Sequence, residues 1–287
     1  MAPTSPTVAA WELGLRLRER RELMNVTAAA AAKAIRTGQS FVSGVETGRA
    51  KINAAKLAEL TAVLDFDEAE SAELQALREA AAQRAWWSPY SAMYSGDMLR
   101  FIGFEHGAET LRTYSAGLIT GLLQTEAYAM AVMSGGAPNV RLAEATRRVE
   151  VRLKRQQRLA GDDPLKLFAL ITEAALRQHV GGRAVMADQL RHLTTTAEEH
   201  PETIEVRVIP FTADCYNALD GSGFYVMDFA SVRLPQLVWQ ETISTTDLIE
   251  QPMRIREYSL AYEQAMGFAL DRTGSLRLIE QIRKEFE

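Results

Sequence analysis

Residues 15–49 read LRLRERRELMNVTAAAAAKAIRTGQSFVSGVETGR, and this stretch predicts three short helices joined by tight turns. Thr27 precedes five alanines, so its side-chain oxygen can accept a hydrogen bond from a free N–H in the first turn of a helix, and alanine has the highest helix propensity. Gly38 suits a turn that needs relaxed backbone angles. Val42 and Val45 are three residues apart, and we expect them to face a core from a third helix. The stretch therefore predicts a small helical domain.

The same stretch resembles the phage lambda repressor type of helix-turn-helix, the Cro or xenobiotic-response-element (XRE) class. The resemblance covers residues 10–66 and rests on positions that fit the family's pattern, namely Leu17, Arg18, Arg21, Thr27, Ala32, Ser43, Glu46 and Gly48. It implies that the third helix enters the major groove of double-stranded DNA. Ala28 departs from the family, which usually has a glutamine there to support the recognition residues.

The resemblance implies base contacts from four residues near the start of the third helix: Gln39, Ser40, Phe41 and Ser43. A glutamine can bind an adenine through two hydrogen bonds, to N6 and N7. Phe41 has two interpretations that the sequence leaves open, which are packing on a thymine methyl group and filling the edge of the domain's core.

The resemblance also implies a structural ion pair between Arg21 and Glu46, which would join the first helix to the end of the third. Losing one partner of such a pair leaves a costly unpaired charge. Contacts to DNA phosphates are expected from five residues around the third helix, against the alternative of an ordinary solvated charged surface: Thr27, Arg18, Arg36, Arg49 and Lys51.

Charge is distributed unevenly along the chain. Residues 1–64 contain nine Lys or Arg and five Asp or Glu, a net charge of +4, whereas the whole chain carries −5, which leaves −9 for the remainder. A positive amino-terminal part has the sign that attracts DNA phosphates. The sequence thus predicts a DNA-binding domain attached to an acidic body.

Composition limits the classes of protein to which the chain can belong. The 287 residues include one cysteine, Cys215, which excludes an intrachain disulfide framework and a multi-cysteine zinc site. No apolar run approaches the roughly 20 residues needed to span a bilayer, and the first residues lack the pattern of an export signal. We therefore expect a cytoplasmic protein, with residues 1–9 as a disordered tail.

The helix-turn-helix domain is expected over 10–66, and an alanine-rich linking helix over 67–87. Trp86 and Trp87 are followed by a proline, and they mark the predicted boundary with a second domain at 88–287. The tryptophan pair is expected to fill an apolar joint between the domains, with ligand stacking as the alternative.

The second domain shows both helical and strand patterns. Alternating apolar residues predict strands at 165–171, 204–208, 223–229 and 237–241. Helical patterns cover 98–105, 122–133, 139–159, 173–180, 185–198, 252–270 and 275–286. The sequence predicts an α+β domain with a small sheet of about four strands.

The second domain also resembles a known arrangement. GLLQTEAYA at 121–129, the arginine-rich segment that ends at Leu159, EAALRQHVGG at 173–182, VRVIPF at 206–211 and VWQE at 238–241 occur in this order. Together they resemble the domain of the WhiJ-like or Scr1-type antitoxin-like regulators of actinobacteria, over residues 100–281. Ile119-Thr120-Gly121 departs from the proline that usually precedes this motif. The resemblance implies a small partner protein encoded nearby.

The sequence offers no constellation typical of an enzyme. It lacks a nucleophile elbow, a phosphate-binding loop, a dinucleotide fingerprint and a paired-histidine metal motif. Cys215 is a lone cysteine, and Glu173 and Glu241 are interpreted as structural residues at strand ends. No catalytic residue, metal or cofactor is expected.

We therefore expect a sequence-specific transcription regulator that acts as a homodimer. Its second domain would dimerise and respond to a small partner protein or a metabolite. The alternative is an antitoxin-like protein that mainly sequesters a small partner and regulates its own promoter. An effector enzyme tethered to DNA ranks last.

Overall fold

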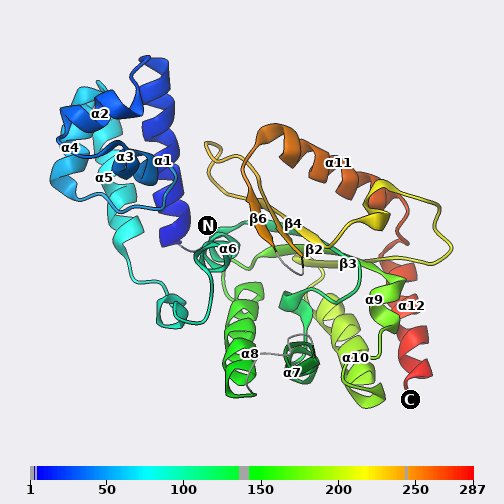
Figure 1. Ribbon diagram of the computed structural model, residues 1–287. Helices are drawn as coiled ribbons and strands as arrows, with labels where there is room; N and C mark the ends of the chain where they lie inside the picture. The colour runs from blue at the N-terminus through cyan, green and yellow to red at the C-terminus, as the bar shows by residue number, and fades with distance from the viewer. Residues whose placement is uncertain (1–2, 4, 136–141, 243–244) are drawn as a thin grey trace. The chain divides into compact units, whose positions relative to one another are not determined.

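The computed structural model describes residues 3, 5–135, 142–242 and 245–287 (Figure 1). They form two compact units, Pro3–Gly107 and Ala108–Glu287. The boundary lies after Gly107 and not at the predicted position, Ser88. The helix that ends at Gly107 belongs to the first unit because it packs onto the first helix of the chain. Trp11 and Phe104 meet edge to face at 5.3 Å between ring centroids, and the Ser5 hydroxyl donates to the carbonyl oxygen of Gly103 at 2.6 Å.

The first unit is entirely helical within its described residues. Its elements are α1 (Pro6–Leu23), α2 (Ala28–Ala34), α3 (Gln39–Glu46), α4 (Ala54–Val63), α5 (Glu68–Ala82), the short 3-10 helix η1 (Ser88–Tyr90) and α6 (Gly96–Gly107). The prediction of a disordered tail over 1–9 is wrong from Pro6 onward. Ser5 caps α1 by accepting from the Val8 N–H, and Pro6 suits the first helical position because its missing N–H would be unpaired there.

Helix α5 is part of this unit's core and not a linker. It begins with a capping box, in which Asp67 accepts from the Glu70 N–H at 2.8 Å and Glu70 accepts from the Asp67 N–H at 3.2 Å. Leu74 is fully buried in the core cluster formed by α1 to α5. Trp87 is buried as well, against the ring of His106 in α6, so its packing lies inside the first unit.

The second unit is built on a mixed sheet of six strands. These are β1 (Thr110–Ser115), β2 (Lys166–Thr172), β3 (Ile204–Ile209), β4 (Phe224–Asp228), β5 (Leu237–Glu241) and β6 (Thr246–Ile249). Their order is β3-β2-β1-β4-β5-β6. The pairs β1/β2 and β2/β3 are parallel, and the other three pairs are antiparallel. The prediction of about four strands missed β1 and β6.

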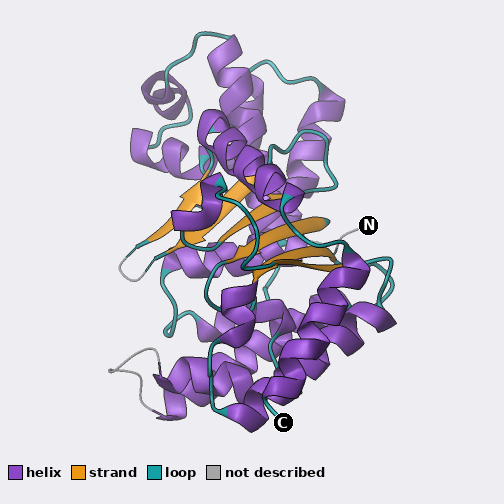
Figure 2. Ribbon diagram, turned by 90° about the vertical axis from the view of Figure 1, so that its right-hand side faces the viewer, coloured by secondary structure: helices purple, strands orange, loops and turns teal. Residues whose placement is uncertain are grey.

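Helices cover both faces of this sheet (Figure 2). They are α7 (Glu126–Gly135), α8 (Leu142–Gln156), α9 (Glu173–Arg177), α10 (Arg183–Glu199), α11 (Pro252–Gly267) and α12 (Arg272–Glu285), with the 3-10 helices η2 (Gly121–Leu123), η3 (Gln157–Leu159) and η4 (Asn217–Asp220). Helix α11 lies on one face, and α7, α8 and α10 lie on the other (Figure 1). The helix predicted over 139–159 is described from Leu142, because 139–141 lie outside the described residues.

The segment that follows β1 is held in place by buried glutamines. Gln189 of α10 is fully buried; it donates to the Leu123 carbonyl and accepts from the Thr125 N–H, both at 2.7 Å. Gln124 donates to the Ile119 carbonyl at 2.6 Å. These contacts fix the backbone of residues 119–125.

Replacing Gln189 with alanine is therefore expected to destabilise the second unit by about 2–4 kcal/mol, since two buried backbone groups lose their partners. Chemical denaturation followed by circular dichroism measures the change. Gln178→Ala, at an exposed glutamine, is the matched control and should cost less than about 0.5 kcal/mol. Equal stability of the two variants would contradict the assigned role of Gln189.

Candidate nucleic-acid interface

Helix α3 exposes one face and buries the other. Val42 and Val45 are buried in the core of the first unit, whereas Gln39 and Ser40 are exposed at the start of the helix. The N-cap is Gly38, so no side chain covers the first turn. The exposed first turn of α3 is therefore accessible to base edges, as the helix-turn-helix geometry requires.

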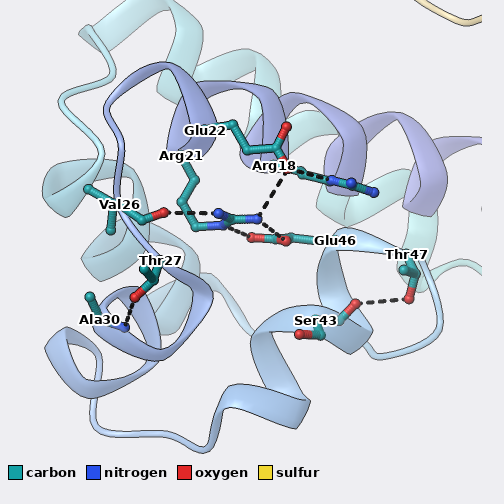
Figure 3. Close-up of polar contacts among 9 residues, drawn as sticks. All are labelled: Arg18, Arg21, Glu22, Val26, Thr27, Ala30, Ser43, Glu46 and Thr47. Carbon is teal, nitrogen blue, oxygen red and sulfur yellow. Dashed lines mark hydrogen bonds and ion pairs between the residues drawn. The ribbon is translucent and has the colours of Figure 1, made fainter.

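The other two predicted base-contacting residues are less accessible. Phe41 is half-buried and packs against the core of the first unit, which places it at the core edge, one of its two interpretations. Ser43 is also half-buried, and its carbonyl oxygen accepts from the Thr47 hydroxyl at 2.9 Å (Figure 3). Gln39 and Ser40 are thus the exposed members of the predicted set.

Arg21 and Glu46 form a nearly buried ion pair between α1 and α3 (Figure 3). Arg21 Nε lies 2.6 Å from Glu46 Oε1, and Nη2 lies 2.8 Å from Oε2. The side chains are 11% and 7% exposed. Arg21 Nη1 also donates to the Val26 carbonyl at 2.9 Å, directly before the cap of α2. One guanidinium therefore joins α1, α3 and the start of α2, which fixes the direction of α3.

Close backbone approach supports the same arrangement. A Cβ at Gly14 of α1 would overlap the carbonyl oxygens of Val45 and Glu46, the latter at 2.6 Å. Gly48, just after α3, has a φ of +66°, and a Cβ there would lie 3.1 Å from the Trp11 nitrogen. Both positions favour glycine, because it alone lacks a Cβ.

The turn before α3 differs from its predicted conformation. Gly38 has φ −84° and ψ 151°, which any residue adopts, and the left-handed residue is Arg36, with φ +53°. Arg36 follows the C-terminus of α2, and Asn25 and Asp65 occupy similar left-handed positions after α1 and α4. At the ends of α1, α2 and α4 the left-handed conformation thus belongs to the helix that ends there and not to the start of the next one.

The predicted phosphate-contacting residues fall into two groups. Arg36, Arg49 and Lys51 are exposed on either side of α3 in sequence; Arg49 is 64% exposed and lies 3.9 Å from Asp97. Arg18 and Thr27 have partners within the unit. Arg18 Nε donates to Glu22 at 2.8 Å, which lowers the pKa of the Glu22 carboxyl, and the Thr27 oxygen accepts from the Ala30 N–H at 3.1 Å (Figure 3).

Lys33 is an exposed cation that the sequence interpretation missed. It lies in the last turn of α2, and its carbonyl accepts from the Arg36 N–H. Its position three residues before Arg36 is the signal that could have identified it. By contrast, Lys56 donates to the Ile35 carbonyl at 2.6 Å and to Glu59 at 2.8 Å, so it is engaged within the unit.

The positive charge is local and does not extend over the first unit. Residues 65–107 add three arginines and eight Asp or Glu to the +4 of residues 1–64, which gives −1 for the unit. Six of these acids lie in 65–79, around the start and middle of α5. The positive charge near α3 therefore comes from the exposed cations next to that helix and not from the unit as a whole.

Three residues of the second unit to which the sequence assigned no catalytic role differ in their burial: Glu173, Cys215 and Glu241. Glu173 is buried; it accepts from the Phe211 N–H at 2.8 Å and from Arg177 Nε at 2.7 Å, so it holds a loop against α9. Cys215 and Glu241 are exposed. The geometry gives Glu173 a structural role.

Comparison with known protein families identifies one family in the amino-terminal part of the chain and another in the carboxyl-terminal part. Residues 12–74 match a family model described as a helix-turn-helix domain, and residues 98–281 match one described as a domain of unknown function, DUF5753. Searches of curated proteins and of solved structures found no match. In the described part of the chain, no helix is both long enough and apolar enough to cross a membrane. The first match indicates a DNA-binding regulator, and the second spans nearly two thirds of the chain, so the protein belongs to the DUF5753 family.

Proposed function

We propose that the protein is a sequence-specific transcription regulator that binds double-stranded DNA through α3. The observation that carries this proposal is the exposed pair Gln39 and Ser40 on a helix whose direction is fixed by the Arg21–Glu46 ion pair. Cations on both sides of α3 supply contacts that position the helix without reading sequence.

The regulator acts as a homodimer in this proposal. One recognition helix contacts few base pairs, and two helices on half-sites about 34 Å apart restore affinity and specificity. The second unit provides dimerisation and receives a signal from a small partner protein or a metabolite, with no catalytic step of its own. The resemblance to WhiJ-like regulators supports the partner protein.

Genome-wide binding of the wild-type chain and of Gln39→Ala tests the proposal. Sites at several promoters that disappear in the variant would support a regulator. Binding confined to the protein's own promoter, together with tight binding of the neighbouring gene's product, would favour the antitoxin-like alternative. Peaks that are identical in the two proteins would overturn base reading by α3.

Arg49→Ala is expected to weaken binding to all duplexes to a similar extent. Each lost phosphate contact reduces the salt-dependence slope by about 0.9, so a dimer would lose about two units. Titrations by fluorescence anisotropy at several salt concentrations measure this slope. Arg84→Ala removes an exposed arginine beyond α5 and should leave the slope unchanged. A loss restricted to the specific sequence would instead assign Arg49 to base contact.

A further inference from the structure

Helix α11 buries one face and exposes two large apolar residues on the other. Ile255, Tyr262 and Ala265 are buried within the core on this face of the sheet. Met253 and Leu260 are 71% and 53% exposed. They are seven residues apart, which is close to two helical turns, so they lie on the same side of the helix.

These two residues belong to a row that we call the α11 stripe: Met253, Arg256, Leu260, Glu263 and Gly267. All five members are exposed. Arg256 precedes Leu260 by about one turn and Glu263 follows it by about one turn. At 1.5 Å of rise per residue the two charged residues are about 10 Å apart along the axis, too far for them to form an ion pair with each other.

The order of residues in the α11 stripe is self-complementary. If two copies of α11 pack antiparallel about a two-fold axis at Leu260, residues equally spaced before and after Leu260 face each other. Leu260 then meets Leu260 of the partner subunit, and Arg256 lies close to Glu263 of the partner subunit. A two-fold axis produces each such contact twice.

The ends of the α11 stripe fit the same pairing. Met253 would lie over Gly267 of the partner subunit, where no atom lies within 4 Å of the position that a Cβ would occupy. On the other side of the stripe, the exposed Glu257 would face Gln264 of the partner subunit, so no like charges meet. Leu219 of η4 is 55% exposed, and η4 adjoins α11 because the Asn217 N–H donates to Gln264 at 3.2 Å.

We propose that the α11 stripe is the surface through which two copies of this chain form a homodimer. The inference rests on the proposed function in one respect, which is that two recognition helices must be joined to read two half-sites. A second copy is the occupant that the charges favour, because the antiparallel arrangement matches the cation of one stripe with the anion of the other.

Charge reversal in the full-length protein tests this surface. Arg256→Glu and Glu263→Arg should each raise the dimer dissociation constant by about tenfold or more, since each creates two like-charge contacts. An equimolar mixture of the two variants should form a heterodimer in which both contacts are attractive. The double variant Arg256→Glu/Glu263→Arg should regain wild-type dimerisation. Analytical ultracentrifugation over a range of concentrations measures all four.

Glu257→Arg is the matched control, because it reverses a neighbouring exposed charge that faces an amide. The Glu257→Arg protein should dimerise with the wild-type dissociation constant. Mixed with Arg256→Glu, it should not restore the dimerisation that Arg256→Glu has lost. Thermal unfolding checks that every variant folds. We expect all of them to fold, because the substituted side chains are exposed. The proposal is overturned if the single variants remain as dimeric as the wild type, or if mixing them restores nothing.

The test separates this inference from the proposed function. A wild-type chain that stays monomeric at about 100 μM, far above the dissociation constant of a working dimer, overturns the interface, while Gln39-dependent binding to DNA can still be measured. Dimers that respond to charge reversal as expected support the interface even if Gln39→Ala leaves DNA binding intact, a result that would overturn base reading alone.

Discussion

Replacing Glu46 with alanine is expected to lower the free energy of unfolding of the first unit by about 3–5 kcal/mol, because Arg21 would remain nearly buried without its carboxylate partner. The loss also removes the link between α1 and α3. Denaturant unfolding followed by tryptophan fluorescence measures it, since Trp11 lies in α1 of the same unit.

Two variants separate the ion pair from simple truncation. Glu22→Ala removes the exposed partner of Arg18 and should cost less than about 1 kcal/mol. Replacing both residues of the buried pair with apolar ones, as in Arg21→Met/Glu46→Leu, should recover much of the stability lost by Glu46→Ala. If Glu46→Ala is no less stable than Glu22→Ala, the pair does not hold α3 in place.

Replacing Gln39 with alanine is expected to reduce strongly the discrimination between the specific sequence and other DNA. A lost bidentate contact costs about 1–3 kcal/mol at each half-site, or about 2–6 kcal/mol for a site with two halves, which is a loss of at least about thirtyfold in affinity for the specific sequence. Binding to unrelated duplexes should change little, because the cations around α3 are retained. Competition between a specific and a random duplex measures the ratio.

Gln83→Ala is a suitable control for this experiment. Gln83 is exposed at the C-terminal end of α5, so the same change of side chain is made in the same unit away from α3. An equal loss of specificity in both variants, or a retained specificity in Gln39→Ala, would contradict the assignment of Gln39 to base reading.

Local signals were sufficient to predict α2 and α3. Thr27 caps α2, and the spacing of Val42 and Val45 identifies the buried side of α3. These features depend on residues a few positions apart. The turn between α2 and α3 was predicted less well. Gly38 has an ordinary conformation, and Arg36 is the left-handed residue, because it follows the C-terminus of α2.

The sequence did not predict the strands β1 and β6, and β1 forms through pairing with segments that are distant in the sequence. Strand β1 reads TLRTYS, which has little apolar alternation, yet it lies between β2 and β4 in the sheet. Arg112 in β1 is accommodated because it pairs with Asp228 of β4 at 3.0 Å, more than one hundred residues later. Strand β6 has four residues at the edge of the sheet, too few to show a period. The assignment of α6 to the first unit likewise depends on the contact between Trp11 and Phe104.

The uneven charge of the first unit has a consequence for how quickly a target is found. At about 0.15 M salt, interactions between exposed charges are largely screened beyond about 8 Å, so neither the net charge of −5 nor the cations near α3 act on a distant duplex. In the proposed function, approach of the chain to a duplex is therefore not accelerated by long-range steering, and the cations near α3 act only once the two molecules are in contact.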